Sequence, residues 1–154
     1  MADVDRALAF YCDILGFTLN VDARTFGLPI AFLAAGAYHH HIALNASGGG
    51  GAVPPPPGHT GLHHVAIVYP GCAELARAVD RVVRSGRALD GARDHCATVS
   101  VYLKDPDQNG LELYYDRPYA EWFDRAGQLI VRNDPFDPAT LIAGVDAPAD
   151  AGVV

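Results

Sequence analysis

One carboxylate, Glu112, lies inside a run that is otherwise apolar and aromatic, GLELYYD. In an extended chain Leu111 and Leu113 point to one face, while Glu112 and Tyr114 point to the other. Burying a carboxylate between apolar neighbours costs several kcal/mol unless a cation or hydrogen-bond donors meet it. Glu112 is therefore either a solvent-facing residue of a half-buried strand or a ligand.

The segments around Glu112 predict a strand, a turn and a second strand. Residues 99–104 are β-branched and aromatic, residues 105–110 (DPDQNG) have the composition of a turn, and residues 111–115 form a second extended run. We expect this pair of strands to fix the direction in which Glu112 points.

Apolar periodicity predicts two helices, over residues 3–15 and 74–85, with Asp3 capping the first. Gly16 and Gly86 stand where a helix ends in a left-handed residue. Further extended segments are expected at residues 17–21, 28–33, 38–45, 62–69 and 87–94.

The two halves of the chain have the same plan. Gly16 and Gly86 are 70 residues apart, and the same shift places His41 beside Glu112 on the last strand of each half. The second half begins with a strand before its helix, whereas the counterpart of that strand would precede Met1. The sequence thus predicts an α+β fold of two β-α-β-β-β modules, with the first strand of module one absent.

This plan divides the chain into parts of different composition. We expect one domain over residues 1–143 and a disordered tail over 144–154, which is rich in Ala, Asp, Pro and Gly. The domain comprises module one (1–45), a Gly- and Pro-rich linker (46–60), module two (61–117) and a C-terminal extension (118–143).

The overall composition excludes several classes of protein. The chain has 154 residues, 50% hydrophobic and 19% charged, which is typical of one globular domain. A net charge of −7 argues against nucleic-acid and anionic-membrane partners. Three cysteines without C-x-x-C spacing, no long apolar run and no signal-peptide pattern predict a soluble cytoplasmic protein.

The two-module plan, GLHHVAIV opening the second module and YLKDPDQNGLELYYDRP closing it, resembles the vicinal oxygen chelate superfamily (glyoxalase, bleomycin resistance, extradiol dioxygenase). Within this superfamily the chain resembles most the catechol 2,3-dioxygenase-like branch. The segments that carry this resemblance are HHHIALN, the DH before the closing motif, and the EW after it. The resemblance covers residues 2–143. It implies that each module curls into half a barrel and that the pair forms a cupped mixed sheet.

The resemblance also implies metal ligands on the first and last strands of the modules. Carried over by motif, these are His64 and Glu112, with His41 on the last strand of module one as the substitute for the ligand that would precede Met1. Two imidazoles and a carboxylate suit Fe(II), with Mn, Zn or Ni as alternatives and no metal if the site is degraded. For His64 the alternative is a hydrogen-bonded strand histidine. For His39, His40, His41 and His63 a structural or exposed position is favoured over a role as a ligand.

A second motif of the same branch consists of a His, then an aliphatic–Tyr pair, then Asp-Pro. His95, Tyr102 and residues 105–106 fit it, while Gln108 stands where Gly or Pro is expected and Arg93 also departs. By resemblance His95 and Tyr102 are the candidate catalytic residues, acting as acid/base and substrate hydrogen-bonding groups.

Three functions remain open from the sequence. The first is an extradiol ring-cleavage dioxygenase acting on a catecholic or similar small aromatic substrate. The second is a glyoxalase-like isomerase or lyase, and the third is a metal-free binding, resistance or accessory domain. Because module one lacks its first strand, an open sheet edge should remain that another protomer can cover, and we expect a homodimer.

Overall fold

The computed structural model describes residues 1–56 and 58–144. The predicted tail, 144–154, lies outside the described residues except for Gly144, which caps the last helix. Both sheets, with the helices packed on them, form one continuous hydrophobic core. No described helix is both long enough and apolar enough to cross a bilayer.

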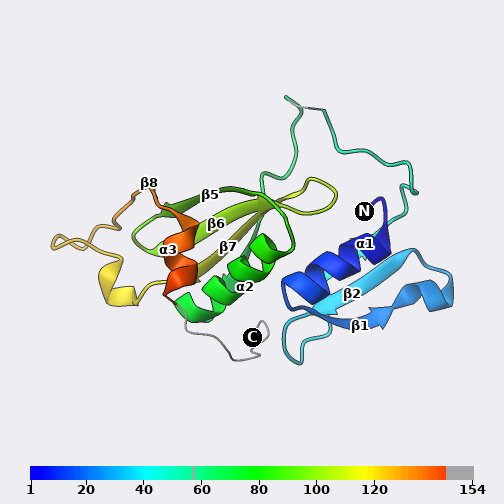
Figure 1. Cartoon of the computed structure of the whole chain (residues 1–154), viewed down its shortest axis with the longest axis horizontal. Helices are drawn as coiled ribbons and strands as arrows, with labels where there is room; N and C mark the ends of the chain where they lie inside the picture. The colour runs from blue at the N-terminus through cyan, green and yellow to red at the C-terminus, as the bar shows by residue number, and fades with distance from the viewer. Residues whose placement is uncertain (57, 145–154) are drawn as a thin grey trace.

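Module one is a helical segment followed by a three-stranded antiparallel sheet (Figure 1). Its elements are α1 (Val4–Leu8), the π-helix η1 (Ala9–Ile14), β1 (Thr18–Asp22), the 3-10 helix η2 (Ala23–Phe26), β2 (Ile30–Ala34) and β3 (Ile42–Asn45). Asp3 caps α1 by accepting from the Arg6 N–H, and Gly16 takes a positive φ of 91°, as predicted. The strand predicted over 38–45 was too long, because Tyr38 to His41 form a bend before β3.

Module two has the complete β-α-β-β-β order. Its elements are β4 (Val65–Tyr69), α2 (Cys72–Arg84), β5 (Leu89–Asp94), β6 (Thr98–Lys104) and β7 (Gly110–Asp116). The extension adds η3 (Tyr119–Glu121), β8 (Asp134–Pro135) and α3 (Pro138–Ala143). The sheet order is β4-β7-β6-β5-β8, in which β4 runs parallel to β7 and the other pairs are antiparallel.

The predicted repeat is confirmed at the level of strand pairing. In module one Leu19 pairs with Leu33 and Leu33 with Ile42. In module two Leu89, Leu103 and Leu111 form the same row, and β1 and β5 each carry an irregularity directly after it. Module one also begins with its helix, without a strand before it in the described chain.

This pairing corrects the predicted match between His41 and Glu112. Phe32 pairs with Ala43 in module one as Tyr102 pairs with Glu112 in module two. Ala43 therefore holds the position of the carboxylate, and His41 lies two residues earlier, ahead of β3. The predicted match failed because the strand begins at Ile42, after the histidines.

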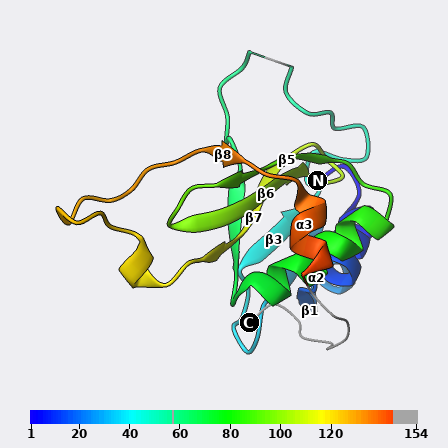
Figure 2. The same ribbon diagram turned by 60° about the vertical axis from the view of Figure 1, so that its left-hand side comes forward.

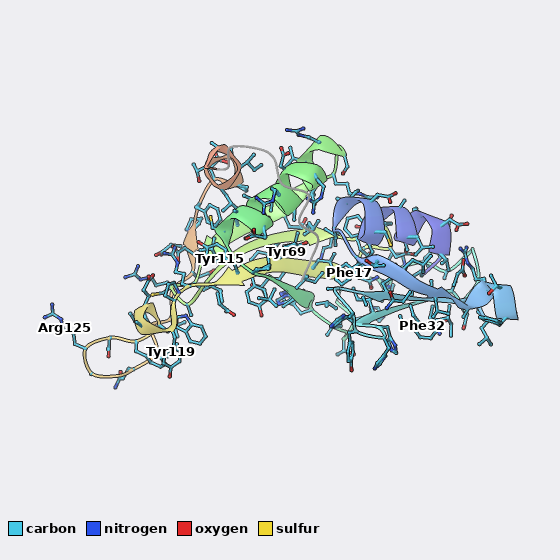
Figure 3. All side chains as sticks on the ribbon, turned by 90° about the horizontal axis from the view of Figure 1, so that it is seen from below. Phe17, Phe32, Tyr69, Tyr115, Tyr119 and Arg125 are labelled. Atoms are coloured by element: carbon cyan, nitrogen blue, oxygen red, sulfur yellow. The ribbon has the colours of Figure 1, made fainter. Side chains whose placement is uncertain are left out.

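The helices lie on one face of both sheets (Figure 3). Val101 and Leu113 are fully buried beneath the helices. Because side chains alternate along a strand, Tyr102 and Glu112 point to the opposite face. Phe32, the module-one counterpart of Tyr102, lies on that opposite face in Figure 3.

The linker and the extension follow the outside of the molecule. Figure 2 shows the linker crossing from β3 to β4, and its described residues contain no helix or strand. In the same view α3 packs along α2, and the segment before it extends away from the sheet before returning as β8.

Candidate functional site

Four side chains form a hydrogen-bonded chain on the face of module two that is turned away from the helices. His64 Nε2 lies 2.9 Å from Glu112 Oε2. The Tyr102 hydroxyl lies 2.7 Å from Glu112 Oε1 and 2.9 Å from His95 Nε2. These are four of the five residues that the sequence selected, and the structure brings them together.

The sheet positions this chain directly. Tyr102 and Glu112 are paired across β6 and β7, so their side chains lie next to each other on one face. His64 immediately precedes β4, whose first residue, Val65, pairs with Leu111. His64 therefore projects to the same face as Glu112, at the end of the strand.

Gly110 allows the start of β4, where His64 lies, to come close to β7. A Cβ at Gly110 would lie 2.3 Å from the His63 carbonyl oxygen and 3.2 Å from His64 Cβ. Because the His63 carbonyl oxygen belongs to the backbone, it can make room only if the start of β4 moves away from β7. The glycine thus maintains the contact between His64 and Glu112.

We expect Gly110→Ala to lower the free energy of unfolding by about 1–3 kcal/mol, the usual range for overpacking. The same change should separate His64 from Glu112. Urea denaturation measures the first effect. The control is Gly61→Ala, because Gly61 has open space around it and an ordinary φ; equal stabilities for the two variants would contradict this account.

The burial of Glu112 decides between its two interpretations. Its side chain is only 14% exposed, and the His64 side chain is 28% exposed. A solvent-facing carboxylate would not be shielded in this way, and both Glu112 oxygens have a polar partner. Glu112 is therefore a paired group of the site rather than part of a solvated strand face.

His95 is held from its other side by the extension. Its Nδ1 lies 2.9 Å from the Arg132 carbonyl oxygen, which can only accept, so Nδ1 carries a proton. The Tyr102 hydroxyl has one proton to share between Glu112 and His95. In the neutral ring, Nε2 is the acceptor that faces the Tyr102 hydroxyl.

No sequence pattern indicates the Arg132 contact. It is made by a backbone carbonyl in a segment without regular structure, just before β8. Only the pairing of β8 with β5 brings that segment back to His95, since Asp94 pairs with Asp134. Such a contact depends on tertiary backbone geometry and leaves no residue pattern.

The surroundings of Tyr102 keep its hydroxyl protonated. Partial burial, together with the hydrogen bond and negative charge of Glu112, raises the pKa of Tyr102 to about 12. At neutral pH the group is a hydrogen-bond donor next to a carboxylate, which suits a residue that orients an oxygen-bearing substrate.

We expect Tyr102 of the metal-free protein to ionise near pH 12, measured as the tyrosinate absorbance of the wild type minus that of Tyr102→Phe. The pKa in the fold is above its unfolded value of about 10, so the native state keeps the proton longer. Stability should therefore fall as the pH rises from 10 through 12. A difference titration centred near pH 10 would refute this description of the site.

His39, His40 and His41 have other partners, whereas the exposed ring of His63 packs against that of His64, with the ring centroids 4.9 Å apart. His41 Nδ1 accepts from the Ala35 N–H at 3.2 Å, and His39 and His40 contact each other through Nδ1 atoms 2.8 Å apart. Within residues 1–56 and 58–144, no three His, Cys, Asp or Glu side chains are grouped as a metal site would require.

The two candidate ligand atoms that meet in the structure have a spacing that a divalent metal can use. Ligands about 2.1 Å from a metal at a right angle are about 3.0 Å apart. The 2.9 Å between His64 Nε2 and Glu112 Oε2 is an ordinary hydrogen-bond length, and the same separation suits two neighbouring ligands of a metal. An imidazole and a carboxylate are also the donor types of non-haem iron and related sites. His64 and Glu112 can therefore hold two adjacent coordination positions.

Comparison with known proteins gives matches in one superfamily. A family model described as Glyoxalase/Bleomycin resistance protein/Dioxygenase superfamily matches residues 1–113. A catechol-2,3-dioxygenase from Bacillus subtilis is 34% identical over 142 residues, which are 90% of this chain and 47% of that protein. A probable lactoylglutathione lyase from Synechocystis is 29% identical over 119 residues, 73% of this chain and 87% of that protein.

Among solved structures, a glyoxalase/dioxygenase from Nostoc punctiforme superposes with a TM-score of 0.63 at 22% identity, over 77% of this chain and 86% of that one. This match supports the two-module fold that the sequence resemblance implied. The chain spans about half the length of the Bacillus dioxygenase that it matches.

Proposed function

Because the chain belongs to the glyoxalase/bleomycin resistance/dioxygenase superfamily, we propose that it binds a divalent metal at His64 and Glu112 and acts on a small aromatic vicinal diol as an extradiol ring-cleavage dioxygenase. The observation that supports this most is the four-residue chain, in which the two candidate ligands continue directly into Tyr102 and His95. The similarity to the Bacillus catechol-2,3-dioxygenase supports the same substrate class.

The role of each residue follows from its contacts. His64 and Glu112 would hold the metal, which would supply Lewis acidity towards the oxygens of the diol. Fe(II) is the metal we propose, with Mn, Zn and Ni as alternatives. Tyr102 is the hydroxyl donor closest to Glu112 and is placed to orient a substrate oxygen.

His95 is the proton-transfer group of the proposal. Its Nε2 faces the Tyr102 hydroxyl, and its Nδ1–H is fixed by the Arg132 carbonyl. A substrate hydroxyl that displaces the Tyr102 contact can pass its proton to Nε2 of the neutral His95 ring, and the same nitrogen can return that proton later. The fixed ring orientation keeps Nε2 directed at the reacting side.

An isomerase or lyase is the second candidate. The Synechocystis protein, a probable lactoylglutathione lyase, is matched over 87% of its length. In such a reaction Glu112 would serve as both ligand and proton acceptor, and no dioxygen would be consumed. The two candidates are thus separated by whether oxygen is used.

Oxygen consumption tests the proposal. Protein reconstituted anaerobically with Fe(II) is mixed with catechol, and dioxygen uptake is followed; resorcinol, whose hydroxyls are not adjacent, is the matched substrate. We expect one dioxygen consumed per catechol cleaved and none with resorcinol. Turnover of a thiol-adduct substrate without oxygen uptake would favour the lyase, and metal binding without turnover would favour a binding or resistance domain.

We also propose that the protein forms a homodimer and functions in the cytoplasm. The dimer is supported by the free edge of β3, which has no partner on its outer side in the described sheet. Sedimentation velocity measures the assembly state, and a stable monomer at micromolar concentration would argue against the dimer.

A further inference from the structure

Arg93 lies on the same face of module two as the four-residue chain, and the proposed function gives it no role. Its neighbour Ala92 pairs with Val101, and both belong to the hydrophobic core. Because side chains alternate along a strand, Arg93 projects to the opposite face, the one that carries Tyr102 and Glu112. Arg93 is also one of the two residues at which the chain departs from the second motif of the dioxygenase-like branch.

The guanidinium of Arg93 is turned towards Tyr102. In the β5–β6 ladder Gly91 pairs with Tyr102, and a Cβ at Gly91 would lie 3.8 Å from Arg93 Nη1. The guanidinium therefore lies beside the position that a side chain of residue 91 would have, next to the tyrosine. Burial and Glu112 raise the pKa of Tyr102, and the positive charge of Arg93 acts on the same hydroxyl in the opposite direction.

The positive charge of Arg93 is not neutralised by a carboxylate. Within residues 1–56 and 58–144 Arg93 forms no ion pair, and its one hydrogen bond runs from Nη1 to the Ala92 carbonyl oxygen, 2.9 Å away. The adjacent carboxylate, Asp94, pairs with Arg117 instead.

The other donors of Arg93 are open to a ligand. The residue is half-buried, and in the described part of the chain none of its side-chain nitrogens is buried without a partner. A guanidinium presents several N–H groups in a planar fork that matches the two oxygens of a carboxylate. Arg93 can therefore bind an anionic group that reaches it from the site.

Arg93 and the candidate metal ligands lie on opposite sides of Tyr102. Gly91 on β5 and Glu112 on β7 both pair with Tyr102 on β6, so two strand spacings, about 10 Å, separate β5 from β7. An aromatic ring whose diol is held at Glu112 can lie over Tyr102 with its far end towards Arg93.

We propose that Arg93 selects the substrate, and that the substrate is an aromatic vicinal diol with a carboxylate on the side of the ring away from the diol. This inference rests on the proposed function, in which His64, Glu112 and Tyr102 hold the diol end. The carboxylate accepts hydrogen bonds from the free donors of Arg93, and such charge-assisted bonds are stronger than those between neutral groups. A neutral diol binds at the same place without this contact.

Equilibrium binding tests this inference separately from catalysis. Isothermal titration calorimetry, with ferrous ion present and dioxygen absent, compares 3,4-dihydroxybenzoate with 3,4-dihydroxybenzamide, which has a similar shape and no charge. We expect the wild type to bind the acid at least about tenfold more tightly than the amide, roughly the effect of one hydrogen bond to a charged group. Oxygen uptake with catechol, measured in parallel, reports on the proposed function alone.

Two arginines give matched protein variants. Arg93→Gln removes the charge and should reduce the preference for the acid to within about twofold, while the affinity for the amide stays within about twofold of the wild type. Arg125→Gln makes the same change at an exposed residue at the far end of the extension (Figure 3) and should keep the full preference.

Three results would overturn the inference. They are equal or no binding of the acid and the amide by the wild type, an equal loss for both ligands in Arg93→Gln, which indicates a structural role, and the same result for Arg93→Gln and Arg125→Gln. Oxygen uptake with catechol but no preference for the acid would leave ring cleavage standing and exclude Arg93 from substrate selection. An Arg93-dependent preference without oxygen uptake would support the inference and count against ring cleavage.

Discussion

Glu112→Gln is expected to lower catechol-dependent oxygen uptake at least about a hundredfold, since even supporting partners of metal ligands are worth 10- to 100-fold. The substitution keeps the shape of the side chain but removes the negative charge that pairs with His64 and Tyr102. An amide is a weaker metal ligand than a carboxylate, and its N–H₂ group cannot accept from either partner.

A second effect of Glu112→Gln does not depend on turnover. Glu112 is one cause of the raised pKa of Tyr102, after burial. We therefore expect the ionisation of Tyr102 in the metal-free variant to move down from about 12 towards its ordinary value. Glu121→Gln is the control, because that side chain is 53% exposed and outside the chain of four. Unchanged oxygen uptake in Glu112→Gln would remove Glu112 from the site.

The second large effect is expected at Asp105, a carboxylate that is 1% exposed. It accepts from the Asp107 and Asn109 backbone N–H groups, from the Asn109 side chain and from the Tyr11 hydroxyl. The first three contacts shape the turn between β6 and β7. The Tyr11 contact joins η1 of module one to that turn in module two.

We expect Asp105→Ala to lower the free energy of unfolding by about 3 kcal/mol or more, because it leaves several buried donors unpaired at 1–3 kcal/mol each. Tyr11→Phe removes only the contact between the modules and should cost about 1 kcal/mol. Chemical denaturation measures both, with Asp116→Ala on the exposed end of β7 as the control. A loss for Asp105→Ala no larger than that of Asp116→Ala would contradict this role.

Much of the fold was predictable because local patterns and the repeat agree. Alternation in 99–115 placed Glu112 opposite the core, and paired glycines placed the two helices. The motif departure at Gln108 also has a structural counterpart, since Gln108 adopts a positive φ of 67°, which a glycine would take without strain. The selection of His64, Glu112, Tyr102 and His95 came from the resemblance of their motifs to the superfamily.

Two features of the site were beyond sequence reasoning for physical reasons. His41 was placed on a strand because YHHHIALN reads as one extended run, but the His41 ring accepts from the Ala35 N–H and closes a bend instead. The hydrogen bond that orients His95 is accepted by a backbone carbonyl oxygen, a group that every residue type has. Side-chain patterns predict which face of a strand a residue occupies. The contacts of His41 and His95 depend instead on the path of the backbone in segments outside the regular strands.

The central claim is that His64 and Glu112 hold a metal ion, and an anaerobic titration with ferrous ion tests it most directly. We predict one ion bound per chain in the wild type and in His63→Ala, whose imidazole belongs to the neighbouring exposed residue. His64→Ala should lose that binding. Equal binding by His64→Ala and the wild type, or no binding by the wild type, would contradict the account.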